Sequence, residues 1–155
     1  MLSGSPILFQ YPDLKYKYQI IRTLIDFLAS PKLRGCFYVS FRKFKDYKTG
    51  YQVQVRFVIA QHSRDYQLIN SFIKYFNSGN ISENLKAVYF TVSKFSDIEE
   101  KIIPFFQKFQ LQGSKRLDFE DLCKIVKLMN QKSHLTLEGL EQIKKIKTGM
   151  NTGIN

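Results

Sequence analysis

Two runs of alternating apolar and polar residues, separated by a turn, constrain the fold of this chain more than any other feature. The first run covers residues 35–44 and the second covers 51–59. Side chains of a β-strand point to opposite faces in turn, so each run predicts a strand with one buried face. Residues 46–50 have the composition of a turn, and the whole segment therefore predicts a long β-hairpin. The apolar positions are Phe37, Val39, Phe41, Tyr51, Val53, Val55, Phe57 and Ile59.

The polar face of this hairpin has the composition of a nucleic-acid-binding surface. From Lys32 to Arg56 the chain has seven basic residues and one acid, a net charge of +6. Lysine and arginine contact phosphates, and glutamine and arginine can form paired hydrogen bonds to base edges. The alternative interpretation is an ordinary solvated strand face. The predicted contact residues are Tyr38, Ser40, Arg42, Lys43, Phe44, Lys45, Lys48, Gln52, Gln54 and Arg56.

The kind of nucleic acid stays open at this stage. A twisted two-stranded ribbon fits the major groove of DNA. RNA would be bound through phosphates, 2′-hydroxyls and bases stacked on Tyr38, Phe44 or Tyr51. The net charge of +11 over 155 residues favours a polyanionic partner, with an acidic membrane surface as the second choice. No apolar stretch is long enough to predict a membrane span, and the two cysteines and two histidines lack zinc-ligand spacing.

The rest of the chain predicts helices on both sides of a second, shorter hairpin. Helical spacing of apolar residues occurs at 17–28, 64–76, 96–109, 118–131 and 136–150, and a strand is predicted at 87–93. The order is αββαββα with two appended helices, which indicates an α+β fold with helices on one face of an antiparallel sheet. We expect an N-terminal arm at 1–16, one domain at 17–151 and a tail at 152–155.

Four blocks of sequence resemble a known family. They are GCFYVSFRK at 35–43, GYQVQVRFVIAQHSRD at 50–65, IIPFFQKFQLQGSKRLDF at 102–119 and KSHLTLEGLEQIKKIKTGMN at 132–151. In this order they resemble single-motif LAGLIDADG homing endonucleases and the related intron maturases of organelles. The resemblance implies a saddle-shaped sheet laid on nucleic acid. It also implies paired signature helices, each ending in an acid that binds a divalent metal, usually Mg²⁺.

The signature itself departs from the family pattern. The family sequence is similar to LAGFIDAEG, whereas residues 27–35 of this chain are FLASPKLRG. Arg34 occupies the position of the metal-binding acid, and Lys32 occupies that of a common Asp. A guanidinium offers only donors, whereas Mg²⁺ takes oxygen ligands. Asp26 lies about two helical turns upstream, and an alignment through LIDF at 24–27 needs an insertion before Gly35. We therefore expect a degenerate site without catalytic residues, metal or other cofactor, unless the chain is an Mg²⁺-dependent nuclease after all.

Two other family positions are retained. Gln61 resembles a polar residue at the active-site end of the second strand, and Lys115 resembles a basic residue near the scissile phosphate. We interpret both as vestigial phosphate contacts. The equally simple alternatives are a turn glutamine and a solvated lysine.

The altered signature also bears on assembly. Pro31, Lys32 and Arg34 would crowd the helix seam and place like charges across a two-fold axis. We therefore expect no homodimer of the family type, and a protein or folded RNA covering the free helix face.

The function expected from these observations is a non-catalytic RNA-binding protein that has lost its endonuclease activity. The setting expected first is the mitochondrial ribosome in the organelle matrix, where the chain would bind ribosomal RNA and neighbouring ribosomal proteins. The alternatives are an intron maturase or splicing cofactor, an active homodimeric DNA endonuclease, and a DNA-binding remnant such as a repressor of its own element.

Overall fold

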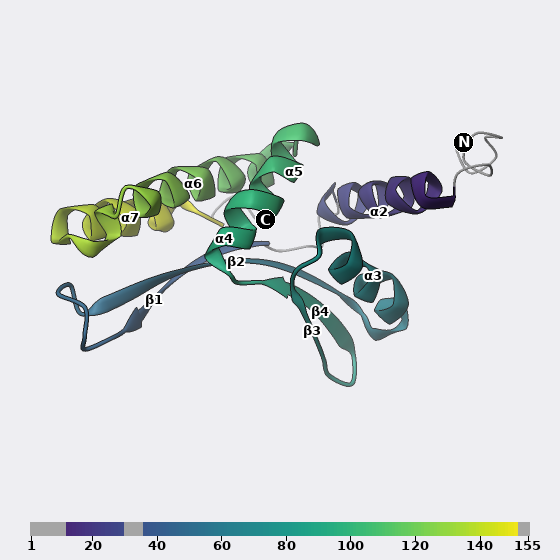
Figure 1. The fold of residues 1–155 in the computed structure, drawn as a ribbon, viewed down its shortest axis with the longest axis horizontal. Coiled ribbons are helices and arrows are strands. Elements are labelled where there is room, and N and C mark those ends of the chain that lie inside the picture. Colours follow the sequence, from purple (N-terminus) through teal and green to yellow (C-terminus); the bar gives the residue numbers. More distant parts are fainter. Residues whose placement is uncertain (1–11, 30–35, 152–155) are drawn as a thin grey trace.

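The structure is a computed structural model that describes residues 12–29 and 36–151 (Figure 1). Its elements follow the expected αββαββα order with two further helices, which confirms the α+β fold. In chain order they are α2 (Pro12–Ala29), β1 (Phe37–Lys43), β2 (Tyr51–His62), η2 (Ser63–Asp65), α3 (Tyr66–Phe76), β3 (Asn80–Glu83), β4 (Ala87–Val92), α4 (Phe95–Asp97), η3 (Ile98–Ile102), α5 (Ile103–Lys108), α6 (Gly113–Asn130), η4 (Ser133–Leu135) and α7 (Leu137–Gly149).

Helix α2 begins earlier than the sequence pattern predicts. Proline is favoured in the first turn of a helix, where its missing amide has no carbonyl to bond, and the helix begins at Pro12. Residues 12–16 are therefore helical, although the sequence pattern predicted a helix only from residue 17. The buried stripe of the helix is formed by Ile20, Leu24 and Leu28. Pro31, which we expected to crowd the helix seam, lies outside the described residues.

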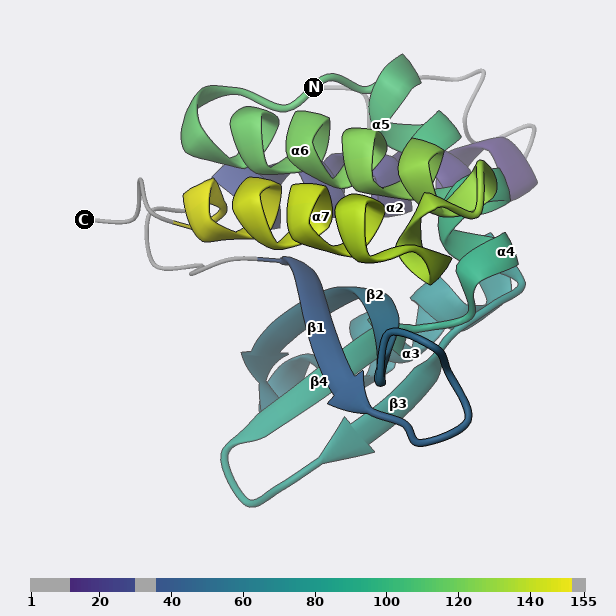
Figure 2. The same ribbon diagram turned by 90° about the vertical axis from the view of Figure 1, so that its left-hand side faces the viewer.

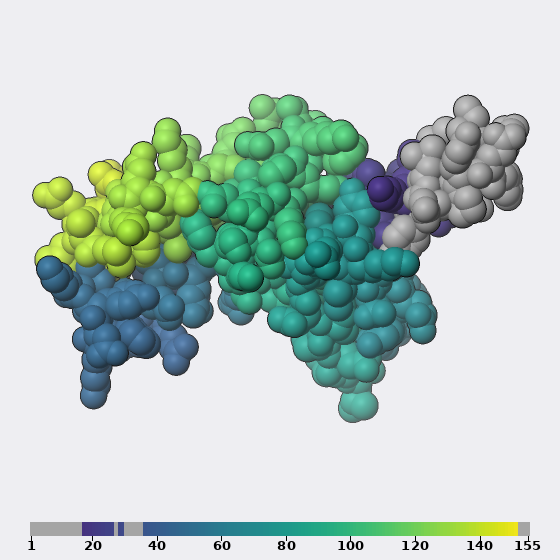
Figure 3. Space-filling model, in the orientation of Figure 1, coloured from purple at the N-terminus to yellow at the C-terminus, as the bar shows by residue number. Residues whose placement is uncertain are grey.

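The four strands form one antiparallel sheet in the order β1-β2-β4-β3. Two hairpins make up this sheet, and we name them hairpin 1 (residues 37–62) and hairpin 2 (residues 80–92). Helices α5, α6 and α7 lie on one side of the sheet (Figures 1 and 2). The turn of hairpin 2 extends away from them, whereas the turn of hairpin 1 lies near the end of α6 and η4 (Figure 1). In the space-filling view the hairpins form two lobes with a hollow between them (Figure 3). The sheet thus has one face covered by helices and one open face.

Aromatic rings fill the core beneath the covered face. Phe37, Phe57 and Phe106 are almost fully buried, with ring centroids 5.4–5.5 Å apart. Under hairpin 2, the Phe90 ring lies 5.7 Å from Phe72 and 6.0 Å from Phe76. The alternation in the sequence therefore assigned the buried face of hairpin 1 correctly.

The helical segment after hairpin 2 is continuous but not uniform. Residues 98–102 are π-helical, and the amide of Ile103 bonds to the carbonyl of Ile98. Pro104 has no backbone N–H and cannot donate a hydrogen bond to the carbonyl one helical turn before it. This favours the π-helical hydrogen bond between residues five positions apart. Helices α6 and α7 then run side by side over hairpin 1 (Figure 2). Within the described residues, no helix is both long and apolar enough to cross a bilayer.

Candidate nucleic-acid interface

The open face of hairpin 1 presents polar side chains that are paired across the two strands. In an antiparallel sheet, directly opposed residues share a face and lie close together. The register therefore joins residues from both strands into one polar surface, as the sequence predicted. The opposed pairs are Tyr38 with Arg56, Ser40 with Gln54, and Arg42 with Gln52.

Local contacts hold these side chains in defined positions. The Nε2 atom of Gln54 donates a hydrogen bond of 3.4 Å to Oε1 of Gln52. The guanidinium of Arg56 lies 5.9 Å from the centre of the Tyr38 ring, a distance at which a cation is attracted to the ring face. Partial burial raises the pKa of Tyr38, so its hydroxyl remains protonated at neutral pH. These side chains can offer both donors and acceptors to a base edge.

The turn of hairpin 1 adds exposed positive charge. The amide of Phe44 donates to the carbonyl of Gly50 at 2.9 Å, which closes the turn. The Phe44 ring packs edge-on against Tyr47, with 4.9 Å between ring centres. Around this turn Lys43, Lys45 and Lys48 are exposed. They can reach phosphates on either side of the strands, as a phosphate-binding loop requires.

Hairpin 2 extends the open face with residues that the sequence reading missed. The register places Thr91 opposite Val58 and Asn80, and Tyr89 opposite Ala60 and Ser82. Every second residue of β4 is buried, so the intervening ones lie on the open face. The alternation in residues 87–92 was the available signal. This alternation did not predict a binding surface, because the two strands of the hairpin lack the basic residues that mark hairpin 1.

Lys115 lies where α6 begins, beside the end of α2. It lines a crevice of about 330 Å³ together with Ile25, Leu28 and Ala29 of α2 and residues 110–114. Gln61 lies on β2 opposite Val88 and does not line this crevice. Lys32 and Arg34, the proposed degenerate positions, lie outside the described residues.

A buried carboxyl group accompanies Lys115. Asp118 is 5% exposed, and its Oδ1 accepts a hydrogen bond of 2.9 Å from the amide of Asn151. Burial raises the pKa of Asp118 and of the Cys36 thiol, while the charge of Lys115 opposes both shifts. The amide side chain of Asn151 also donates to the carbonyl of Phe37 at 3.2 Å. These contacts tie the end of α7 to the start of β1 and α6.

The acidic side chains do not by themselves fit a divalent metal ion. In the described part of the chain, no group of three or more His, Cys, Asp or Glu side chains could hold one. Asp118 is engaged by the Asn151 amide. Asp26, the acid nearest to the altered signature, is exposed on α2 and lies 3.7 Å from Arg22. Magnesium needs several oxygen ligands, and these residues do not supply them.

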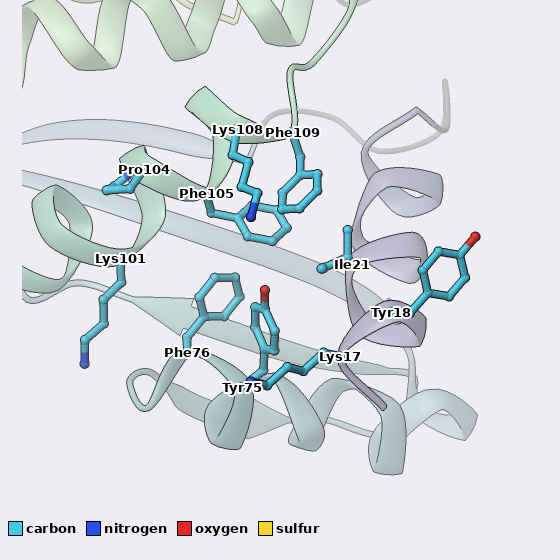
Figure 4. A pocket seen from close by; sticks show the side chains of 10 residues that line it. All are labelled: Lys17, Tyr18, Ile21, Tyr75, Phe76, Lys101, Pro104, Phe105, Lys108 and Phe109. Atoms are coloured by element: carbon cyan, nitrogen blue, oxygen red, sulfur yellow. The ribbon is translucent and has the colours of Figure 1, made fainter. Parts of the chain in front are cut away.

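A separate groove lies between α2, α3 and α5 (Figure 4). It has a volume of about 620 Å³ and an aromatic floor, with the Tyr75 and Phe105 ring centres 6.1 Å apart. Lysines 17, 101 and 108 stand around it. None of the residues that the sequence predicted to bind nucleic acid lines this groove.

Comparisons with known proteins identify similar sequences and folds. The sequence pattern of a family described as LAGLIDADG endonuclease matches residues 34–126. A probable intron-encoded endonuclease 3 of Neurospora crassa is 42% identical over 98 residues, which is 62% of this chain. This chain spans only 18% of that relative's length.

Two solved structures have a closely similar fold. The meganuclease I-SmaMI bound to uncleavable DNA aligns with a TM-score of 0.74 at 43% identity, covering 77% of this chain and 42% of that one. The homing endonuclease I-TnaI aligns with a TM-score of 0.76 at 35% identity, covering 86% of this chain and 88% of that one. These similarities confirm the family and the fold expected from the four sequence blocks.

The same findings contradict the expected function. The relatives are named as endonucleases, and I-SmaMI is bound to DNA. The expectation of a catalytically inactive ribosomal protein bound to ribosomal RNA and ribosomal proteins was therefore wrong. It rested on net charge, which favours any phosphate backbone, and on one segment of altered sequence. The expected absence of a metal is not confirmed either, because endonucleases of this family typically use divalent metal ions.

Proposed function

Because this chain belongs to the LAGLIDADG endonuclease family, we propose that it is the DNA-binding domain of a sequence-specific DNA endonuclease. Its substrate is duplex DNA, which lies against the open face of the sheet. A second such domain, from another copy or from a longer protein, completes the cleavage centre. The alignment with I-SmaMI covers 42% of that protein's chain, so more than half of I-SmaMI lies outside it. This supports a requirement for two domains.

The observation that carries this proposal is the register of hairpin 1. It places Arg42 opposite Gln52 and Arg56 opposite Tyr38 on the helix-free face. A twisted two-stranded ribbon enters the major groove, where arginine and glutamine distinguish base pairs. Lys43, Lys45 and Lys48 then contact the flanking phosphates. Hydrogen bonds to phosphates fix the position of the protein, and contacts to base edges select the sequence.

We assign Lys115 an electrostatic role at the scissile phosphate. Its position beside the end of α2 supports this role. An ammonium group placed there stabilises the negative charge that develops on a phosphate during cleavage. Since the described acidic side chains do not form a metal site, and residues 1–11, 30–35 and 152–155 contain no Asp or Glu, we propose that carboxylates for a divalent ion come from the second domain.

The proposal is tested by selecting duplexes from a randomised DNA library with the 155-residue chain. We expect a defined sequence, and we expect Gln52→Ala/Gln54→Ala to change the preferred bases at the positions under hairpin 1. The matched control is Gln131→Ala/Gln142→Ala, which removes two exposed amides on the helical side. Identical selections by the wild type and both double variants would refute this interface.

The cleavage step has its own measurement. The selected duplex is incubated with the chain and Mg²⁺, and the products are mapped on both strands. Cutting at fixed positions that is lost in Lys115→Ala supports the assigned role. Equal cutting by Lys115→Ala and the wild type contradicts it.

We also propose that the protein acts in the mitochondrial matrix. The intron-encoded nature of the fungal relatives supports an organellar gene. Fractionation of fungal cells, with protease treatment of intact and of opened organelles, tests this location. Recovery of the protein outside the organelles would refute it.

A further inference from the structure

The turn of hairpin 2 carries an unusually exposed leucine. Leu85 is 98% exposed, more than Leu117 at 61% or Leu137 at 69%, which lie on helices. Turns of two to four residues usually have Gly, Asn, Asp or Ser, because such residues suit both the backbone and the solvent. A leucine at this position gains nothing from the fold, since no core residue contacts it.

The backbone around Leu85 is held firmly. The Asn84 side-chain carbonyl accepts hydrogen bonds from the amides of Lys86 at 2.9 Å and Ala87 at 2.8 Å. The backbone N–H of Asn84 donates to the backbone carbonyl of Ala87 at 2.9 Å. These bonds close the turn on both sides of Leu85. The leucine is therefore presented on a fixed backbone, which reduces the entropy lost when a partner covers it.

The position of the turn indicates which partner covers it. The connection between β3 and β4 lies at the far end of hairpin 2, on the side of the sheet opposite to α5, α6 and α7 (Figure 1). In the space-filling view, hairpin 2 forms the lobe at one side of the hollow (Figure 3). A duplex placed against the open face therefore meets this turn. Lys86 stands next to the leucine and provides a cation for a phosphate.

We propose that Leu85 is an apolar wedge for duplex DNA. When the open face docks, the turn inserts the leucine side chain at one base step and partly unstacks it, while Lys86 binds the adjacent phosphate. Apolar side chains that insert between base pairs unstack and kink duplexes in this way. Pyrimidine–purine steps unstack with the least energy. Leu85 thus selects a TA or CA step without any hydrogen bond to a base.

This inference rests on the proposed function and deepens it. The two hairpins would recognise DNA by different physical means. The polar face of hairpin 1 reads hydrogen-bonding groups, and the tip of hairpin 2 reads the deformability of one step. The site of the selected step should lie at a fixed offset from the bases read by Gln52 and Gln54.

The test uses the full 155-residue chain and a randomised duplex library. We expect the wild type to enrich a pyrimidine–purine step at one position, Leu85→Ala to lose that preference alone, and Leu85→Phe to retain it. Leu137→Ala is the matched control, because it removes an exposed leucine from α7. Binding of the selected duplex should weaken about tenfold in Leu85→Ala.

A second measurement separates a wedge from a simple contact. The adenine of the selected step is replaced by 2-aminopurine, whose fluorescence rises when its stacking is lost. We expect a rise with the wild type and Leu85→Phe, and none with Leu85→Ala. If Leu85→Ala keeps the same preference and the same fluorescence, the wedge is wrong while DNA binding stands. If the wild type selects no sequence at all, both the proposed function and the wedge are refuted.

Discussion

Hairpins 1 and 2 are built on the same antiparallel pattern but differ in charge and in what supports them. Hairpin 1 carries Arg42 and Arg56 on its open face and three exposed lysines near its turn. Hairpin 2 has uncharged Asn80, Ser82, Tyr89 and Thr91 on the corresponding face. One saddle therefore combines a strongly cationic half with a nearly neutral one. Affinity from phosphate contacts should reside mainly in hairpin 1, and hairpin 2 should act by shape and neutral hydrogen bonds.

The side chains packed beneath the two hairpins also differ in polarity. Phe90 of hairpin 2 is fully buried between aromatic rings. The outer end of hairpin 1 is only partly buried and lies under lysines of α7. The Nζ atom of Lys144 is 4.9 Å from the Tyr51 ring centre, and that of Lys147 is 5.4 Å from Phe41. Hairpin 2 thus rests on buried aromatic rings, whereas the outer end of hairpin 1, away from the buried Phe37 and Phe57, has a more polar and weaker support.

The largest expected effect comes from removing the aromatic support of hairpin 2. Phe90→Ala should lower the free energy of unfolding by about 3–5 kcal/mol, because it leaves a cavity between Phe72 and Phe76. Phe41→Ala under hairpin 1 should cost only about 1–2 kcal/mol, since that ring is half-buried. Urea denaturation followed by circular dichroism measures both. Equal losses would contradict the proposed difference in support.

The second effect concerns the source of DNA affinity. Lys43→Ala/Lys45→Ala should weaken binding roughly a hundredfold and lower the salt-dependence slope by about 2, because each phosphate contact releases counterions. Asn80→Ala/Thr91→Ala should leave that slope unchanged and alter only base preference. Fluorescence anisotropy titrations at several salt concentrations give both quantities. A similar drop in slope for both double variants would contradict the proposal that phosphate contacts reside mainly in hairpin 1.

Much of this architecture could be read from local sequence, for a physical reason. Alternation fixes which face of a strand is buried, and a short turn then fixes the register. That is why the alternation in residues 35–59 could predict that Arg42 and Gln52 lie on the same face of the sheet. The same logic applied to residues 87–92, but without basic residues the pattern suggested no function.

Contacts between distant residues could not be anticipated in this way. Asn151 bonds to Phe37, 114 residues away, and to Asp118, 33 residues away. In the sequence Asp118 resembles any acid in the first turns of a helix, and only the packed fold shows that it is buried. Net charge likewise predicted a phosphate backbone but could not distinguish DNA from RNA. The altered signature at residues 27–35 also carries no information on whether the partner is a ribosome.

A smaller effect is expected from the lysine support of hairpin 1. Lys144→Met keeps the length of the side chain but removes the charge above Tyr51 and Phe41. The free energy of unfolding should fall by about 0.5–1 kcal/mol, the usual range for an exposed cation over a ring. Lys145→Met is the control, because its side chain is exposed on the same helix. Amide exchange in residues 41–53 should increase in the first variant only, and equal exchange in both would show that the ring contacts contribute nothing.

The smallest effect involves His134, which lines a hollow of about 440 Å³ with Tyr47 and Gln52 of hairpin 1. Partial burial lowers the pKa of His134 from its ordinary value of 6.5. The folded state therefore resists protonation, whereas the unfolded chain takes up the proton near pH 6.5. By linkage, this contribution to stability is present above pH 6.5 and is lost as the pH falls below it. His134→Gln should flatten that part of the stability profile and leave hairpin 2 unaffected. Titration of the imidazole by NMR checks the cause directly: a midpoint at or above 6.5 in the folded protein would show that the surroundings of hairpin 1 do not disfavour the charge.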